Sequence, residues 1–363
     1  MFKVILLLNL LIGSAFHSYS MVYFYKIIPS DRPMFHTDFQ YDEQEMCSPI
    51  IKDGILYQGL DNGTILAQDI KYKKILWEYQ LKDKPTSSLT GNDIFVVTTQ
   101  KGNIYAFNIK NGNLLWFYNT HKEIISKPAF QGETLYIQTT LDALYAFNMK
   151  DGSLIWQYTA KKALEGLTVH LVPSPYISDN VLYTGFSNGD AVAIDDQTGK
   201  VIWTHKPPTL KQLQDITVQP VGNSDVVVFA SYDNGLMCLN KKDGTLVWER
   251  NDLKRALGME FTGNALYVVL VEGKVYRLDI RTGDTIWKNE DLGKSNLFAP
   301  QSYDRVIAVG VKSDRYKGIV LLNRDDGRIL KYFSIVSGLS AQPVISDDRI
   351  YAISNGGFLY CYK

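Results

Sequence analysis

The stretch Asn108-Ile-Lys-Asn-Gly112-Asn-Leu-Leu-Trp116 decides the fold, because the chain repeats its pattern along most of its length. An Asn or Asp is followed four residues later by Gly, and the Gly is followed four residues later by Trp. A phrase that recurs about every 40 residues indicates a supersecondary unit repeated in tandem. All six tryptophans of the chain stand at the end of such a phrase: Trp77, Trp116, Trp156, Trp203, Trp248 and Trp287.

Each residue type in the phrase has a predicted physical role. The Asn or Asp side chain caps a turn by accepting hydrogen bonds from nearby backbone N–H groups. Gly supplies the positive φ that a tight hairpin needs, and Trp offers a large flat surface that packs between neighbouring sheets. Two copies are incomplete, since Lys73 replaces Gly before Trp77 and Lys331 replaces Trp after Gly327.

Short strand patterns lie upstream of each phrase, such as Leu182-Tyr-Thr-Gly185 followed by Ala191-Val-Ala-Ile-Asp195. With a short Pro-containing strand before them and the Trp strand after them, they make a unit of four antiparallel strands, A to D. No amphipathic helix of useful length occurs, which excludes helical repeat arrays. We therefore predict an all-β fold, an eight-bladed β-propeller of four-stranded antiparallel blades. The eight units begin near Ser48, Ser87, Ser126, Ser174, Gln219, Gly258, Ala299 and Gln342.

The eighth unit runs out of chain, since Phe358-Leu-Tyr-Cys-Tyr-Lys363 is only its third strand. A ring left in that state would expose an unpaired strand edge. We expect an N-terminal strand, Met34-Phe-His-Thr-Asp-Phe-Gln-Tyr41, to pair with the last blade, with Phe35 in the place of Trp. The propeller is accordingly predicted to span residues 34–363.

The N-terminus carries a targeting signal. Lys3 precedes the apolar run Val4 to Ile12, and small residues follow, which is typical of a secretory signal peptide. We assign residues 1–20 to the signal peptide and 21–33 to a linker; the alternative is an uncleaved N-terminal anchor. No Cys follows the apolar run as a lipobox would require, and no later segment is apolar enough to span a membrane.

Breaks in the repeat indicate where functional loops lie. Residues 161–171 and 206–217 lengthen two D–A connections, and residues 312–317 lengthen a B–C connection. D–A and B–C loops of an up-and-down blade emerge on the same rim of the ring. The first two insertions flank the fourth blade and mix apolar with polar residues, which predicts a partner site. The alternative is that these loops fold back and bury their apolar residues.

Other function classes find little support in the composition. The formal net charge is zero and no run of Lys or Arg occurs, so the electrostatic footprint of a nucleic-acid binder is missing. No nucleophile, zinc-protease or phosphate-loop motif occurs, and the five histidines lack ligand spacing. We expect no catalytic, metal or cofactor site, and we expect Cys238 and Cys361 to be buried in strands without a disulfide.

The phrase Asp195-Asp-Gln-Thr-Gly199-Lys-Val-Ile-Trp203 resembles the repeat of the pyrroloquinoline-quinone (PQQ) propellers. The tandem arrangement, the length and the signal peptide resemble the BamB family of the outer membrane protein assembly (BAM) machinery. The resemblance implies a non-catalytic periplasmic scaffold, peripherally associated with the outer membrane. Its implied partner is the POTRA region of the barrel protein BamA, with nascent outer membrane proteins as a second class of partner.

The family's contact loops match two segments of this chain, Gly166–Leu171 and Gln214–Pro220. The carried-over partner-binding residues are Leu167, Val169, His170, Asp215 and Thr217. Two of them depart from the family pattern, because His170 stands where the family has a basic residue and Thr217 stands where it has a second acidic one. Both changes reduce the charge of the expected contact.

Two alternatives remain open from the sequence. One is a periplasmic propeller of the same repeat type that binds another envelope protein or a ligand. The other is a quinoprotein dehydrogenase, which would need a calcium ion with carboxylate and amide ligands and a vicinal cysteine pair over the cofactor. The three cysteines of this chain, Cys47, Cys238 and Cys361, are far apart in sequence.

Overall fold

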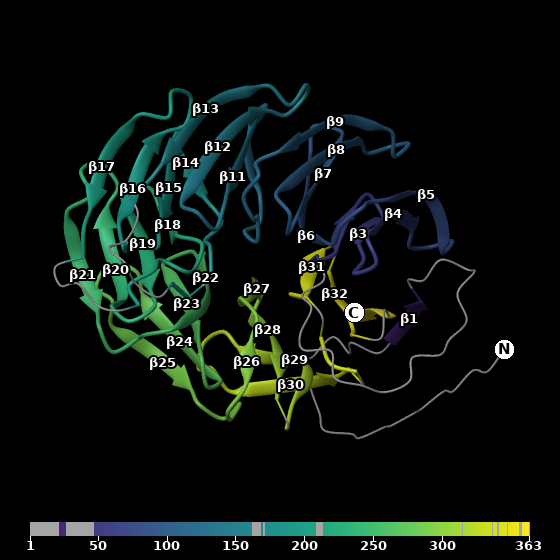
Figure 1. The fold of residues 1–363 in the computed structure, drawn as a ribbon. Coiled ribbons are helices and arrows are strands. Elements are labelled where there is room, and N and C mark those ends of the chain that lie inside the picture. The colour runs from purple at the N-terminus through teal and green to yellow at the C-terminus, as the bar shows by residue number, and fades with distance from the viewer. Residues whose placement is uncertain are drawn as a thin grey trace, which may run out of the picture.

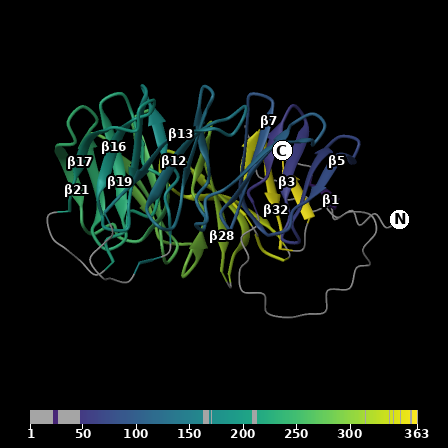
Figure 2. The same cartoon turned by 45° about the horizontal axis from the view of Figure 1, so that its top comes forward.

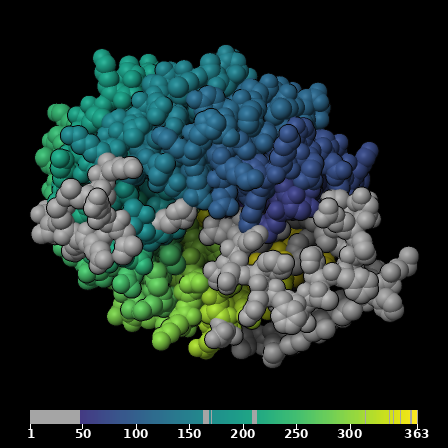
Figure 3. Space-filling model, in the orientation of Figure 1, coloured from purple at the N-terminus to yellow at the C-terminus, as the bar shows by residue number. Residues whose placement is uncertain are grey.

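The computed structural model describes residues 22–26, 47–161, 168–169, 171–207, 213–313, 315–335, 337–339, 341–346, 348–355 and 358–362. These residues form eight separate antiparallel sheets arranged in a ring, which is the predicted eight-bladed β-propeller (Figure 1). In the space-filling view the blades pack side by side around the ring (Figure 3). Within these ranges no helix is long and apolar enough to cross a membrane.

The first four blades each contain four strands in sequence order. Blade 1 comprises β2 (Ile50–Lys52), β3 (Ile55–Gly59), β4 (Thr64–Asp69) and β5 (Lys74–Gln80). Blade 2 comprises β6 (Pro85–Gly91), β7 (Ile94–Thr99), β8 (Asn103–Asn108) and β9 (Leu114–Asn119). Blade 3 comprises β10 (Ala129–Gln131), β11 (Thr134–Gln138), β12 (Ala143–Asn148) and β13 (Leu154–Thr159). Blade 4 comprises β14 (Tyr176–Ser178), β15 (Val181–Gly185), β16 (Ala191–Asp195) and β17 (Val201–His205).

Blades 5 and 6 follow the same plan, the first strand of blade 7 is divided in two, and the fourth strand of blade 8 comes from the N-terminal part of the chain. Blade 5 comprises β18 (Val221–Gly222), β19 (Val226–Ser231), β20 (Gly235–Asn240) and β21 (Leu246–Arg250). Blade 6 comprises β22 (Ala256–Thr262), β23 (Ala265–Leu270), β24 (Lys274–Asp279) and β25 (Thr285–Asn289). Blade 7 comprises β26 (Asn296–Leu297), β27 (Gln301–Tyr303), β28 (Val306–Lys312), β29 (Lys317–Asn323) and β30 (Ile329–Ser334). Blade 8 comprises β31 (Val344–Ser346), β32 (Arg349–Ile353), β33 (Phe358–Tyr362) and β1 (Val22–Lys26).

The strands run from one rim of the ring to the other (Figure 2). One rim, which we call the loop rim, carries the B–C hairpins and the D–A connections. Backbone hydrogen bonds tie the two kinds of connection together: Leu81 N to Gly63 O, Thr120 N to Gly102 O, and Ala160 N to Asp142 O. This confirms the prediction that both kinds of loop emerge on the same side. The opposite rim, which we call the turn rim, carries the A–B and C–D turns.

The tryptophans join neighbouring blades, as their spacing predicts. Each indole is nearly buried and its Nε1 donates a hydrogen bond to a backbone carbonyl in the C–D turn of the next blade, at 2.7–3.0 Å. A buried indole N–H without an acceptor would cost free energy, so each bond helps to set the position of the neighbour. The six pairs are Trp77–Ile109, Trp116–Met149, Trp156–Asp196, Trp203–Lys241, Trp248–Ile280 and Trp287–Arg324.

The Gly of the phrase has a second role that its turn geometry alone does not reveal. Gly112 has φ +70°, and a Cβ added to it would lie 2.6 Å from Cδ2 of Trp77 in the preceding blade. The same contact recurs in the next five blades, so each Gly is the platform on which the indole of the preceding blade lies. The other pairs are Trp116–Gly152, Trp156–Gly199, Trp203–Gly244, Trp248–Gly283 and Trp287–Gly327.

This pairing explains both incomplete copies of the phrase. Blade 1 follows blade 8, whose fourth strand β1 contains no Trp, so no indole covers the position of Lys73. Blade 7 receives Trp287 on Gly327 and therefore keeps its Gly. Its own Trp is replaced by Lys331. In blade 8 the third and fourth strands, β33 and β1, are not consecutive in the chain, so no C–D turn joins them to receive an indole.

Lys73 has φ +57°, a conformation that disfavours residues with a side chain. We expect Lys73→Gly to raise the free energy of unfolding by about 0.5–1 kcal/mol, because the strain removed exceeds the extra entropy of the unfolded chain. Chemical denaturation of the two proteins measures the change. Lys71→Gly, in the same turn but not at positive φ, is the control and is expected to be destabilising. Equal destabilisation by both substitutions would contradict the assignment of strain to Lys73.

The closing strand differs from the segment expected. β1 pairs antiparallel with β33, from Val22 opposite Tyr362 to Lys26 opposite Phe358. It therefore stands at the edge that the sequence analysis gave to Met34–Tyr41, and residues 34–41 lie outside the described residues. The correction has a physical reason, since Val22-Tyr-Phe-Tyr-Lys26 is richer in β-branched and aromatic residues. That an N-terminal strand stabilises the ring stays a prediction.

The apolar core is distributed over the seams between blades. Eight clusters of buried side chains each join two or more adjacent sheets; one, for example, packs Leu56 and Leu66 of blade 1 against Tyr351 and Leu359 of blade 8. The three cysteines are buried in blades 1, 5 and 8: Cys47, Cys238 and Cys361. Burial raises the pKa of Cys47 and of Cys238 to about 12, which keeps these thiols protonated and unreactive at neutral pH.

Candidate functional site

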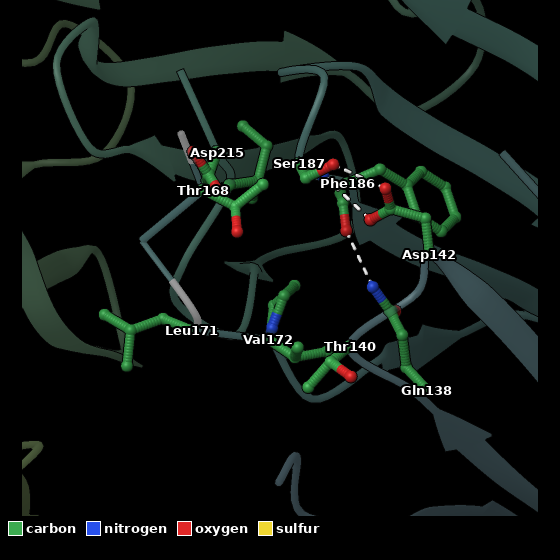
Figure 4. A pocket seen from close by; sticks show the side chains of 12 residues that line it. Gln138, Thr140, Asp142, Thr168, Leu171, Val172, Phe186, Ser187 and Asp215 are labelled. Atoms are coloured by element: carbon green, nitrogen blue, oxygen red, sulfur yellow. Dashed lines mark hydrogen bonds between the residues drawn. The ribbon is translucent and has the colours of Figure 1, made fainter. Parts of the chain in front are cut away.

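A depression in the loop rim lies where blades 3, 4 and 5 meet. Its walls are the B–C hairpins of blades 3 and 4 and the two long D–A connections on either side of blade 4 (Figure 4). Asp142 and Ser187 come from the two hairpins, while Leu171 and Asp215 come from the two connections. The two insertions that the sequence singled out therefore meet at one place.

Asp142 fastens the hairpins of blades 3 and 4 to each other. Its Oδ1 accepts a hydrogen bond from the backbone N of Ser187 at 3.0 Å, and its Oδ2 accepts one from the Ser187 hydroxyl (Figure 4). Asp142 is only 9% exposed and has φ +53°, a conformation that Asp tolerates better than most residues. The blade 3 side of the depression is thereby held rigidly against blade 4.

Asp215 fastens the two long connections to each other. Its side chain is 3% exposed, and its Oδ1 accepts a hydrogen bond from the backbone N of Val169 at 3.1 Å. Burial raises the pKa of the Asp215 carboxyl above its usual value; the bond from Val169 opposes the rise and the charge of Asp142 adds to it. A buried carboxylate that already binds a neighbouring loop is a positioning group rather than a surface charge.

The residues after Asp215 fold back into the propeller. Ile216 is 1% exposed and its backbone N donates to the carbonyl of Phe186 at 3.2 Å. A Cβ added to Gly185 would lie 2.3 Å from Cβ of Ile216, so only Gly leaves room for it. Thr217 is 7% exposed, and its Oγ1 has no hydrogen-bond partner among the described residues. Residues 215–217 therefore follow the alternative considered in the sequence analysis, in which the loop folds back and buries its apolar residue.

The five partner-binding residues expected from the family resemblance therefore differ in their positions. Leu167 and His170 lie outside the described residues. Val169 is half-buried next to the lining residue Thr168, Asp215 is buried in the wall of the depression, and Thr217 is buried and does not line it. A partner could touch Val169 directly, whereas Asp215 would act by holding the loops in place.

Of the two exposed apolar side chains beside the depression, the sequence analysis included Leu171 in the insertion 161–171 and missed Leu141. Leu141, between the lining residues Thr140 and Asp142, is 52% exposed, and Leu171 is 42% exposed. A signal for Leu141 was present, since the corresponding B–C hairpins of other blades end in polar residues such as Asp61-Asn62 and Ser187-Asn188. Two exposed leucines around a rigid depression form the apolar part of a candidate protein-binding surface.

The third irregularity lies on the loop rim of blade 7, away from this depression. Ser313 N donates to Tyr316 O at 2.7 Å, and the ring of Tyr316 meets that of Tyr332 edge-on at 5.0 Å. The extended hairpin is therefore braced by its own side chains. The loop rim carries irregularities in two separate places, and the candidate surface uses those next to blade 4.

In the described part of the chain, no group of three or more His, Cys, Asp or Glu side chains is placed to hold a metal ion. Asp142 and Asp215 are the carboxylates of the depression, and each is occupied by hydrogen bonds within the protein. The arrangement offers surfaces and hydrogen-bonding groups for recognition.

The family model and the curated relatives that match this chain carry the same description. The family model described as outer membrane protein assembly factor BamB matches residues 42–123 and 61–289. The outer membrane protein assembly factor BamB of Yersinia pestis is 25% identical over 323 residues, covering 83% of this chain and 80% of that protein. BamB of Escherichia coli (strain K12) is 25% identical over 331 residues, covering 86% and 83%.

Two solved structures share the fold. BamB from Moraxella catarrhalis superposes with a TM-score of 0.75 at 19% identity, covering 90% of this chain and 99% of that one. A quinohemoprotein alcohol dehydrogenase from Comamonas testosteroni superposes with a TM-score of 0.69 at 12% identity, covering 88% and 74%. At such identities these similarities establish the propeller alone, which scaffolds and enzymes share.

Proposed function

Because the chain belongs to the BamB family of outer membrane protein assembly factors, we propose that it is a non-catalytic periplasmic scaffold of the BAM complex. It binds the POTRA region of a BamA-like barrel protein through the loop rim at blades 3 to 5. The observation that carries the proposal is the hydrogen bond from Val169 N to Asp215 Oδ1, which joins the two insertions into one surface.

The shape and chemistry of this surface suit a protein partner. Leu141, Leu171 and Val169 supply apolar contact area, while Asp142 and Asp215 hold the hairpins and loops beneath it. Interfaces of this kind gain affinity from a few apolar anchors on a preorganised support. The loss of charge at His170 and Thr217, relative to the family pattern, agrees with a contact that is mainly apolar.

A non-enzymatic role is part of the proposal. The PQQ-dependent enzymes that share this repeat cover their cofactor with a vicinal cysteine pair, whereas Cys47, Cys238 and Cys361 lie buried in three different blades. The hydroxyl of Ser187, beside the Asp142 carboxylate in the depression, donates its hydrogen bond to that carboxylate and joins two hairpins. The remaining alternative is a propeller of the same repeat type that binds a different envelope protein.

The location follows from the sequence and also stays a proposal. Residues 1–20 would direct export and be removed, and the mature chain would associate with the outer membrane peripherally. No lipobox Cys follows the apolar run of the signal peptide.

Co-purification tests the proposed function. The tagged full-length protein, isolated from an envelope extract of its native cell, is expected to retain the barrel protein through a wash at physiological ionic strength. Recovery of a different envelope protein with no barrel protein would select the alternative. A control protein in which Leu141 and Leu171 are both changed to Asp should fold normally and recover no barrel protein, because both side chains are exposed.

A further inference from the structure

The C–D turn of blade 1 differs from those of the other blades. Residues 71–74 read Lys-Tyr-Lys-Lys and all four are exposed; we call this segment the lysine turn. Tyr72 is 71% exposed, more than any other large apolar or aromatic side chain described as exposed. The Nζ of Lys71 lies 5.1 Å from the centre of the Tyr72 ring, a cation–π contact on the surface. The turn thus presents one aromatic ring among three ammonium groups.

Lysines in the neighbouring C–D turns are neutralised by carboxylates. Lys110 pairs with Asp93 at 3.5 Å, and Lys150 pairs with Glu133. Within the described ranges no carboxylate forms an ion pair with Lys71 or Lys74. The one acidic side chain at the start of the lysine turn, Asp69, accepts the backbone N of Tyr72 at 2.8 Å and so shapes the turn.

The lysine turn lies close to the start of β1 on the ring. It lies on the turn rim, opposite the depression at blades 3 to 5. Blade 8 packs against blade 1 through the cluster of Leu56, Tyr351 and Leu359. In blade 8, Val22 pairs with Tyr362, at the end of the C strand that faces the turn rim. The start of β1 therefore lies on the same rim as the lysine turn and in the adjacent blade.

We propose that the lysine turn is a docking point for an anionic phospholipid surface. Phosphate groups accept hydrogen bonds from the ammonium groups of Lys71 and Lys74, and each lysine near a membrane is attracted by its negative surface potential. Tyr72 suits the boundary between head groups and acyl chains, because its ring is apolar and its hydroxyl is polar. The formal net charge of the whole chain is zero, so the rest of the chain is net negative and the attraction is local to this turn.

This orientation leaves the candidate protein-binding surface free. With the turn rim against lipid, the loop rim and its depression face away from the membrane, where a soluble domain of a partner can reach them. The inference stands on the lysine turn and does not require the proposed partner, since the two surfaces lie on opposite rims.

Vesicle co-sedimentation of the purified mature protein tests the inference. Wild type is expected to bind vesicles of phosphatidylcholine and phosphatidylglycerol, to bind phosphatidylcholine alone weakly, and to detach as salt is raised. Changing Lys71 and Lys74 together to Glu is expected to weaken binding to the anionic vesicles at least about tenfold. Lys73 is left unchanged in this variant, so that its strained backbone does not enter the comparison.

The matched control changes Lys110 and Lys150 together to Glu, which alters the net charge by the same amount in two turns of the same rim. It is expected to bind nearly as wild type. A second variant, Tyr72→Ser, is expected to weaken binding without altering its dependence on salt. Failure of the wild type to bind, equal binding to neutral vesicles, or equal loss in the two double variants would each overturn the proposal.

Discussion

Gly152→Ala is expected to lower the free energy of unfolding by about 2–4 kcal/mol, a large change for an exposed turn. Gly152 has φ +72°, and an added Cβ would lie 2.6 Å from Cδ2 of Trp116. The methyl group would therefore cost backbone strain and also push the indole away from its blade. Displacement of the ring would lengthen the bond from Trp116 Nε1 to Met149 O, which is 2.9 Å. Thermal or chemical denaturation measures the loss.

Gly132→Ala is the matched control for this prediction. Gly132 lies in the A–B turn of the same blade with φ +58°, and nothing stands within 4 Å of an added Cβ. Its substitution causes backbone strain without a steric clash and is expected to lower the free energy of unfolding by about 1 kcal/mol. If the two variants lost equal stability, the contact between Gly and Trp would contribute nothing and the proposed joint between blades would be wrong.

Asp215→Ala is expected to weaken recovery of the barrel protein by about tenfold in the co-purification experiment, because the hydrogen bond that holds Val169 would be lost. Without that bond the connection between blades 3 and 4 is free to leave the surface on which Leu171 is displayed. The melting temperature should change little by comparison, since both connections lie at the rim and outside the seams of the core.

Asp215→Asn separates the two roles that this residue could have. An amide oxygen can still accept the bond from Val169 N at 3.1 Å, while the negative charge is removed. We expect recovery close to that of the wild type, because the side chain is only 3% exposed. Recovery as poor as that of Asp215→Ala would show that the charge itself contacts the partner, as the family resemblance suggests.

The sequence predicted the ring because the requirements of the repeat are local. Gly at a positive φ and Trp four residues later define a hairpin within nine residues, and their recurrence gives the number of blades. Lys73 and Lys331 showed from the sequence which blades depart from the repeat. The reason for each departure lies in the adjacent sheet, which lacks the Trp or the C–D turn that would complete the contact. The Gly platform and its indole belong to different blades, so their contact is invisible in any single copy of the phrase.

The candidate site could also be predicted from the sequence only in part. The sequence alone determined where the repeat is interrupted, and hence that two long connections meet near blade 4. Only the tertiary structure decided that Asp215 is buried, that Val169 is its partner, that Leu141 is exposed, and that β1 pairs with β33. Burial and pairing depend on groups that the ring brings together from distant parts of the chain. Strand period and turn chemistry, by contrast, depend on neighbours a few residues away.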